Sequence, residues 1–102
     1  MMKPGFIYII TNQYQTVVYT GVTSNLPKRI LEHKEKRYPN SFSARYSLNI
    51  LVYYEQFQWM GDAIAREKQI KAGSREVKND LIRSLNPTCK DLFEEIKDIM
   101  TE

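Results

Sequence analysis

The sequence predicts an α+β fold in which three strands and four helices form one domain over residues 1–102. Segments 5–11, 16–22 and 50–57 are rich in aromatic and β-branched residues, which predicts the strands. Four longer polar segments carry apolar residues at helical spacing. A chain of 102 residues with 42% hydrophobic and 26% charged residues is long enough to enclose one core.

The first two strands are predicted to form a hairpin, because only the polar turn 12–15 separates them. Alternation places Phe6, Tyr8 and Ile10 on one face of the first strand. In the second strand it places Val17, Tyr19 and Gly21 together, and we expect Tyr8 and Tyr19 to share one face of the paired strands. Because Gly21 has no side chain, we expect the backbone of a ligand to approach closely there.

The first helix is expected to begin at Ser24 or Asn25, with Pro27 in its first turn, and to run to about Lys36. Its inward positions are predicted to be Leu26, Ile30 and Leu31. Its polar stripe is predicted to be Arg29, His33, Lys36 and Arg37. One arginine side chain can bind two phosphate oxygens at once, and phenols or imidazoles can exchange protons. This region therefore suits chemistry on a phosphate.

Basic residues concentrate in the first half of the chain. Residues 1–50 carry seven Lys/Arg and two Asp/Glu, whereas residues 51–102 carry eight and ten. The cationic residues expected to contact nucleic acid are Lys28, Lys36, Arg37 and Arg45. Aromatic residues interleave with them in the predicted loop 37–48, which favours phosphate contact and base stacking. The alternative is a solvated helix face with aromatics that pack the loop onto the domain.

A second helix is predicted at 61–72, with Ala63, Ile64 and Ile70 facing inward. Glu67 falls on or beside that side, and a carboxylate near an apolar stripe requires a partner. Two partners remain open, which are Lys71 one turn away and a metal ion.

Two further helices are predicted at 75–84 and 88–100, with Asn86 as N-cap and Pro87 as first residue of the second one. The apolar stripe expected on the last helix is Leu92, Phe93, Ile96 and Met100. Its exposed face is expected to be acidic, with Asp91, Glu94, Glu95, Asp98 and Glu102, and to turn away from DNA.

The composition also excludes several classes. One cysteine, Cys89, and one histidine argue against a disulfide framework and a structural zinc site. No apolar run approaches 18 residues, and the N-terminus lacks the apolar segment of a signal peptide. We therefore expect a cytoplasmic protein without a membrane partner.

Several segments, in this order and spacing, resemble the GIY-YIG nuclease superfamily, and in particular its small stand-alone bacterial members. The segments are Phe6-Ile7-Tyr8, Tyr19-Thr20-Gly21, Arg29, Glu32-His33, Leu51-Val52-Tyr53-Tyr54-Glu55, Ala65-Arg66-Glu67-Lys68-Gln69-Ile70-Lys71 and Asn86-Pro87. The chain departs from the name motif at two positions, because Phe6 stands in place of the first Gly and Thr20 in place of Ile. Thr20 should point away from Tyr19, so we expect it to affect packing rather than chemistry.

The resemblance implies a small three-stranded antiparallel sheet flanked by helices. It also implies hydrolysis of phosphodiester bonds in DNA with one divalent metal ion, Mg²⁺ or Mn²⁺. By position, Glu67 resembles the metal ligand of the family, Arg29 its transition-state clamp and Tyr8 its general base. Tyr19 and His33 resemble its supporting phosphate and proton-transfer groups. The ordinary pKa of a phenol is about 10, so Arg29, His33 and the metal would have to lower it before Tyr8 acts as a base.

Gly21, Lys71 and Asn86 are the expected supporting residues, although helix capping explains Asn86 equally well and Asn79 is a rival. The substrate remains open among branched DNA, damaged DNA, plain duplex and RNA, with structure-selective or weakly selective contact expected. The oligomeric state is open as well. Two alternatives to an endonuclease remain, which are a catalytically weak nucleic-acid-binding module of the same fold and a domain without nucleic-acid function.

Overall fold

A computed structural model of the chain, which describes residues 3–98, contains one antiparallel sheet of three strands with the order β2-β1-β3. The central strand β1 (Gly5–Thr11) pairs with β2 (Val18–Thr23) on one side and with β3 (Ile50–Phe57) on the other. This is the predicted α+β fold. The expected bounds of the first and third strands are confirmed, and β2 begins two residues later than predicted.

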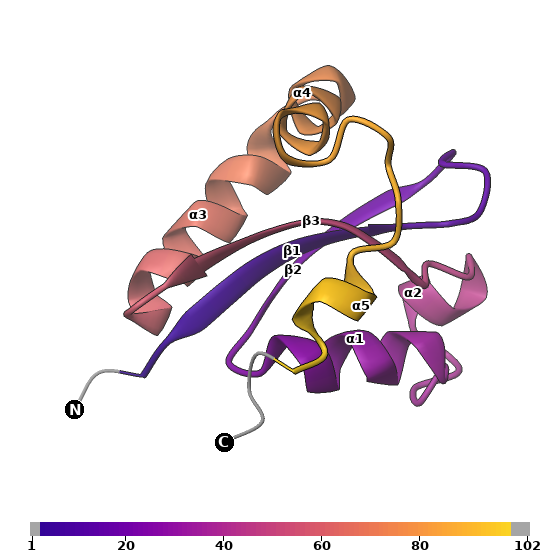
Figure 1. Cartoon of the computed structure of the whole chain (residues 1–102), viewed down its shortest axis with the longest axis horizontal. Helices are drawn as coiled ribbons and strands as arrows, with labels where there is room; N and C mark the ends of the chain where they lie inside the picture. Colours follow the sequence, from indigo (N-terminus) through magenta and orange to yellow (C-terminus); the bar gives the residue numbers. More distant parts are fainter. Residues whose placement is uncertain (1–2, 99–102) are drawn as a thin grey trace.

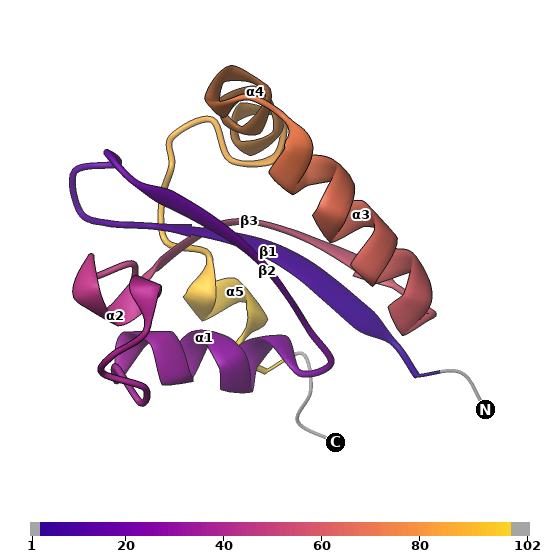
Figure 2. The same cartoon turned by 180° about the vertical axis from the view of Figure 1, so that it is seen from behind.

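Helices cover both faces of the sheet (Figures 1 and 2). Their bounds are α1 (Leu26–Lys34), α2 (Phe42–Arg45), α3 (Met60–Ala72), α4 (Arg75–Leu85) and α5 (Phe93–Ile96). Figure 1 shows α3 and α4 on one side of the sheet and α1, α2 and α5 on the other. None of the helices within residues 3–98 has the length and apolar character that a membrane crossing requires.

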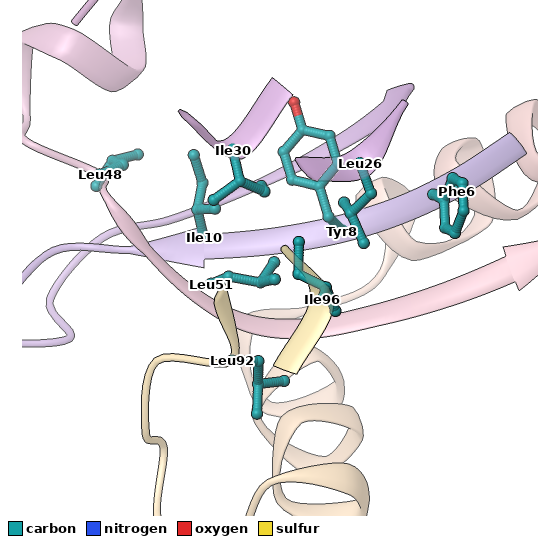
Figure 3. Close-up of a cluster of buried hydrophobic side chains, with 9 residues drawn as sticks. All are labelled: Phe6, Tyr8, Ile10, Leu26, Ile30, Leu48, Leu51, Leu92 and Ile96. Atoms are coloured by element: carbon teal, nitrogen blue, oxygen red, sulfur yellow. The ribbon is translucent and has the colours of Figure 1, made fainter. Parts of the chain in front are cut away.

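Strand β1 is buried along its whole length, because both of its faces carry a hydrophobic core. Phe6, Tyr8 and Ile10 face α1 and α5, as the alternation predicted, and Figure 3 shows the ring of Tyr8 beside Leu26 and Ile30. On the other face, the isoleucines between them pack against α3 and α4. A strand that is covered on both sides reads as a continuous apolar run rather than an alternating one.

Helix α1 begins as expected, since the side chain of Asn25 accepts a hydrogen bond from the backbone N–H of Lys28. It ends at Lys34, two residues before the predicted end, and Lys36 has a φ of 53° that no α-helix accommodates. Leu31 was expected to face inward, but its side chain is exposed. In its place His33 is buried, so the predicted polar stripe is wrong at that position. Helix α3 shows the same kind of error, because Ile64 is exposed.

The predicted loop 37–48 contains the short helix α2, which the sequence did not predict. Ser41 caps it by accepting a hydrogen bond from the backbone N–H of Ala44. Four residues are about one helical turn, so they carry no periodic pattern that a prediction can use.

The predicted helix 88–100 is wrong over its first part, since α5 begins only at Phe93. Asn86 ends α4 instead of capping a new helix, and its side-chain amide donates to the carbonyl oxygens of Val52 and Lys90. Its side-chain oxygen accepts from the backbone N–H of Lys90. These bonds hold the segment 86–90 as a turn against β3, so helical bonding starts later. Met100 and Glu102 lie outside the described residues.

Candidate active site

Tyr8 occupies the centre of the sheet, directly opposite Gly21 in the β1–β2 register. A Cβ atom at Gly21 would lie 2.4 Å from the phenol oxygen of Tyr8, so no other residue fits there without movement. The space beside Gly21 is therefore filled by the ring of Tyr8. The expectation that a ligand backbone approaches at this glycine is wrong, because its role is to seat the phenol.

The phenol oxygen of Tyr8 joins a chain of hydrogen bonds from three different elements. It lies 2.9 Å from Nε2 of His33, and Nε of Arg29 donates to it over 3.4 Å. Nδ1 of His33 lies 2.8 Å from Oγ of Ser43. The two distances at the ring fit either tautomer of His33, and we assign the one in which the Tyr8 hydroxyl donates to Nε2. The proton on Nδ1 then donates to Ser43.

Burial keeps both titrating members of this chain neutral. Desolvation raises the pKa of Tyr8 to about 12, and the nearby charge of Arg29 offsets only part of that rise. Desolvation also lowers the pKa of His33 to about 4, and the charge of Arg29 adds to this effect. The net shift of the Tyr8 pKa is therefore upward, opposite to the lowering that a general-base role was expected to need. The physical reason is that burial outweighs the effect of one cation.

Arg29 is held from two other sides. Its guanidinium forms an ion pair with Glu32 at 3.0 Å, and its Cζ lies 5.7 Å from the centre of the Tyr38 ring. About a third of its side chain, 30%, remains exposed, so the group is positioned in advance yet reachable from solvent. Glu32 appeared in the motif comparison without a role, and the structure shows that it orients the guanidinium.

Tyr19 lies on the same sheet face as Tyr8, as predicted, with ring centres 6.5 Å apart. Its ring is 6.2 Å from that of His33 and 6.3 Å from that of Phe42. Tyr46 follows at 4.7 Å from Phe42. Successive contacts between aromatic rings thus extend from the buried phenol of Tyr8 to the surface at α2.

Glu67 comes from α3, on the other face of the sheet. Its carboxylate lies 2.8 Å from Nζ of Lys71, which is the ion-pair partner that the sequence left open. The same Nζ lies 5.3 Å above the ring of Tyr19. Lys71 therefore connects the helix that carries Glu67 to the strand that carries Tyr19, at the edge of the sheet formed by β2.

Glu67 supplies a single carboxylate, a type of ligand that Mg²⁺ and Mn²⁺ accept but too few donors for a structural zinc site. Among residues 3–98 no group of three or more His, Cys, Asp or Glu side chains could hold a metal ion. A tetrahedral zinc site needs such a group, whereas magnesium binds through one or two carboxylates and keeps several waters. Glu67 is only 12% exposed, and Nζ of Lys71 already balances its charge.

The remaining predicted residues lie in two places. Lys28, Lys36, Arg37 and Arg45 are all exposed, on α1, the following turn and α2. Asn86 is buried at the β3 side of the sheet, and its three hydrogen bonds go to its own turn and to β3. None of these bonds reaches Tyr8, Arg29 or Glu67, so the structure accounts for Asn86 by its structural bonds.

Ser43 is the member of the site that the sequence analysis missed. It is buried and contacts His33 across ten residues of chain. A serine in an irregular loop carries no periodic signal, so only the folded position of α2 reveals it.

Comparisons with known proteins point to one family. The sequence model described as GIY-YIG catalytic domain matches residues 4–80. A UPF0213 protein of Syntrophus aciditrophicus is 34% identical over 86 residues, which covers 84% of this chain and 97% of that protein. A UPF0213 protein of Clostridium perfringens is 36% identical over 84 residues, covering 78% and 84%. The solution NMR structure of a UPF0213 protein from Bacillus halodurans shares the fold, with a TM-score of 0.53, 22% identity and coverage of 97% and 99%.

Proposed function

Because the chain belongs to the GIY-YIG nuclease family and is a relative of the UPF0213 proteins, we propose that it is a metal-dependent endonuclease that hydrolyses phosphodiester bonds in DNA. The observation that carries this proposal is the hydrogen-bonded set of Tyr8, His33 and Arg29. A binding module has no need of a buried phenol joined to a buried neutral imidazole. Such a pair suits proton transfer, with a guanidinium placed beside it for a phosphate.

In the proposed reaction the phenol of Tyr8 takes the proton of the attacking water while its own proton passes to Nε2 of His33. This relay avoids a free tyrosinate, which the raised pKa of Tyr8 disfavours. The depressed pKa of His33 keeps its imidazole neutral at neutral pH, so in the assigned tautomer Nε2 has no proton, although burial makes it a weak base. A bound phosphate beside Arg29 offsets the charge that helps to depress this pKa, so substrate binding strengthens the acceptor.

Arg29 is proposed to bind the nonbridging oxygens of the phosphate, where negative charge grows in the transition state. Glu67 would hold the divalent cation, with waters and phosphate oxygens completing its ligands. When bound, Mg²⁺ or Mn²⁺ supplies further charge neutralisation at the phosphate. Tyr19 is proposed to position the phosphate through its phenol.

A catalytically weak nucleic-acid-binding module is the second candidate, and the ion pair between Glu67 and Lys71 favours it. A carboxylate that already has a cationic partner has less need of a metal. In that case the cations near the site would serve binding alone.

A cleavage screen separates the two candidates. Labelled duplex, flap, junction and single-stranded DNA, with matching RNA, is incubated with Mg²⁺ or Mn²⁺ and with EDTA. The wild-type protein is expected to cleave DNA only with metal, and Glu67→Gln is expected to abolish cleavage while DNA binding in EDTA stays within about threefold. Full activity of Glu67→Gln with the same metal would remove the metal-ligand assignment. Absence of cleavage on every substrate would favour the nucleic-acid-binding module over the endonuclease. Unfolding of Glu67→Gln would show that the ion pair with Lys71 is structural.

A further inference from the structure

A groove of about 400 Å³ lies beside the free edge of β2. Figure 2 shows the elements that enclose it, with α2 on one side of the sheet and α3 and α4 on the other. Its lining includes Tyr19 and Thr20 of β2, Phe42 of α2, and Lys71, Arg75 and Lys78 of α3 and α4.

The groove is cationic, since no acidic side chain lines it. Within residues 3–98, Arg75 bonds to two backbone carbonyl oxygens and to the side chain of Asn79. Lys78 bonds only to backbone carbonyl oxygens, at 2.8 Å from that of Gly73. Neither charge is therefore neutralised by a carboxylate there, which leaves both available to phosphate groups.

Thr20, which lines the groove, has a side-chain oxygen without a hydrogen-bond partner among residues 3–98. Thr20 is 3% exposed, and its hydroxyl has no hydrogen-bond partner in the described part of the chain. Buried hydroxyls almost always find a partner in folded proteins. The expectation that Thr20 acts on packing stays a prediction, and its hydroxyl lies beside the groove as a polar group without a partner among the described residues.

Phe42 lines the groove, and Tyr46 lies beside Phe42. Phe42 and Tyr46 have ring centres 4.7 Å apart and are 47% and 46% exposed. Phe42 also contacts the ring of Tyr19 at 6.3 Å, but this contact leaves about half of its side chain in solvent. Exposed aromatic faces beside cations are the two components of a site for a single nucleic-acid strand.

We infer that this groove binds a single nucleic-acid strand that carries at least one unpaired base. Its phosphates lie along Arg75 and Lys78, since Lys71 is already paired with Glu67, and the unpaired base stacks on Phe42 and Tyr46. In a continuous duplex both faces of each base are already covered by neighbouring bases, so the aromatic pair has no face to contact. Tyr19 lines the groove, and its ring centre lies 6.5 Å from that of Tyr8. A strand in the groove therefore runs beside the phenol proposed for catalysis. The inference rests on the proposed function and specifies the form of nucleic acid that reaches the site.

Binding measurements in EDTA test the inference without any requirement for cleavage. Fluorescence anisotropy compares a labelled single strand of about 15 nucleotides with the duplex of the same sequence. Phe42→Ala and Tyr46→Ala are each expected to weaken single-strand binding by about 5- to 100-fold, the effect of losing one stacked base. Duplex binding is expected to stay within twofold.

Tyr14→Ala is the matched control, because Tyr14 is also an exposed aromatic, at 76%, but lies in the turn between β1 and β2. It is expected to leave both affinities unchanged. Lys78→Gln is expected to reduce the salt slope of single-strand binding by about 0.7, the value for one phosphate contact on a single strand. Lys90→Gln serves as its control on the far acidic segment, where Lys90 pairs with Glu95.

A DNA strand that contains the fluorescent base 2-aminopurine distinguishes stacking on Phe42 from a purely structural role of Phe42. Stacking is expected to quench its fluorescence on binding to the wild-type protein and not to Phe42→Leu, which keeps apolar packing under α2. Equal loss of single-strand and duplex affinity, or unchanged quenching in Phe42→Leu, would overturn the inference. If Phe42→Ala does not fold, Phe42→Leu and Tyr46→Ala decide the question.

These outcomes stay separate from those of the cleavage screen. A protein that binds single strands through Phe42 but cleaves nothing supports the groove and removes the nuclease proposal. A protein that cleaves duplex DNA and binds single strands equally well after Phe42→Ala supports the nuclease and removes the groove.

Discussion

The phenol oxygen of Tyr8 lies 2.9 Å from Nε2 of His33, between a central strand and the helix that follows the hairpin. The contact joins two groups whose pKa values burial moves in opposite directions, to about 12 and to about 4. Both groups are consequently neutral at physiological pH. A neutral hydrogen-bonded pair tolerates burial, whereas either charged form would be expensive there.

The first prediction concerns His33 and acid stability. Its folded pKa of about 4 lies below the ordinary 6.5, so its stabilising contribution is complete above pH 6.5 and is lost as the pH falls toward 4. Urea unfolding between pH 7.5 and pH 4 is expected to show a loss in the wild-type protein that exceeds the loss in His33→Gln by about 3 kcal/mol at most. Gln retains hydrogen-bonding groups but does not titrate. Parallel stability curves for the two proteins would contradict the burial argument.

The second prediction concerns Arg29. Arg29→Ala removes a transition-state contact and the bond to Tyr8, so the cleavage rate should fall by about 10²-fold or more. DNA binding should weaken only modestly, because other exposed cations remain. Single-turnover rates and anisotropy measure the two effects. Arg83→Ala is the control, since Arg83 is exposed and pairs with Asp80 on α4. Equal losses in rate and in binding would assign Arg29 to substrate binding alone.

The third prediction concerns Gly21. Gly21→Ala drives a Cβ atom against the phenol of Tyr8, so it should destabilise the fold by about 1–3 kcal/mol, as overpacking does. Denaturant unfolding checks the value. Combination with Tyr8→Leu should recover much of the loss, which a double-mutant cycle measures. Gly61→Ala is the control, because its nearest neighbours are atoms of the exposed Trp59 ring and alanine favours a helix. Additive losses at Gly21 and Tyr8 would show that the clash is relieved elsewhere.

The fourth prediction concerns the exposed cations after α1. If Lys36 and Arg37 contact phosphates, then replacing both with Gln should flatten the salt dependence of duplex binding by roughly 0.9 per lost contact. Anisotropy titrations at several salt concentrations give the slope. Replacing Lys90 and Lys97, which pair with acidic residues near α5, should leave the slope unchanged. A slope that does not respond to the Lys36 and Arg37 changes would place the binding surface elsewhere.

Local patterns predicted much of the fold and failed at identifiable positions. The central and third strands were predicted with correct bounds, because both segments are rich in aromatic and β-branched residues and are short enough for a strand. Leu31 and Ile64 were misplaced because an apolar residue at the margin of a helical stripe can face either way. Helix α2 was missed because a single helical turn has no periodic pattern. The late start of α5 was missed because Asn86 bonds to Val52 of β3, which is distant in the sequence.

The sequence by itself determined those features of the site that depend on short-range geometry. The two-residue period of a strand places Tyr8 and Tyr19 on one face, and the spacing of four residues brings Lys71 to Glu67. Only the tertiary structure decided that His33 is buried, that Ser43 meets its ring and that Lys71 reaches over the edge of the sheet to Tyr19. These relations depend on how the two helical layers pack against the sheet. The pKa shifts follow from that packing, because desolvation is a property of all the surrounding residues and not of the local sequence.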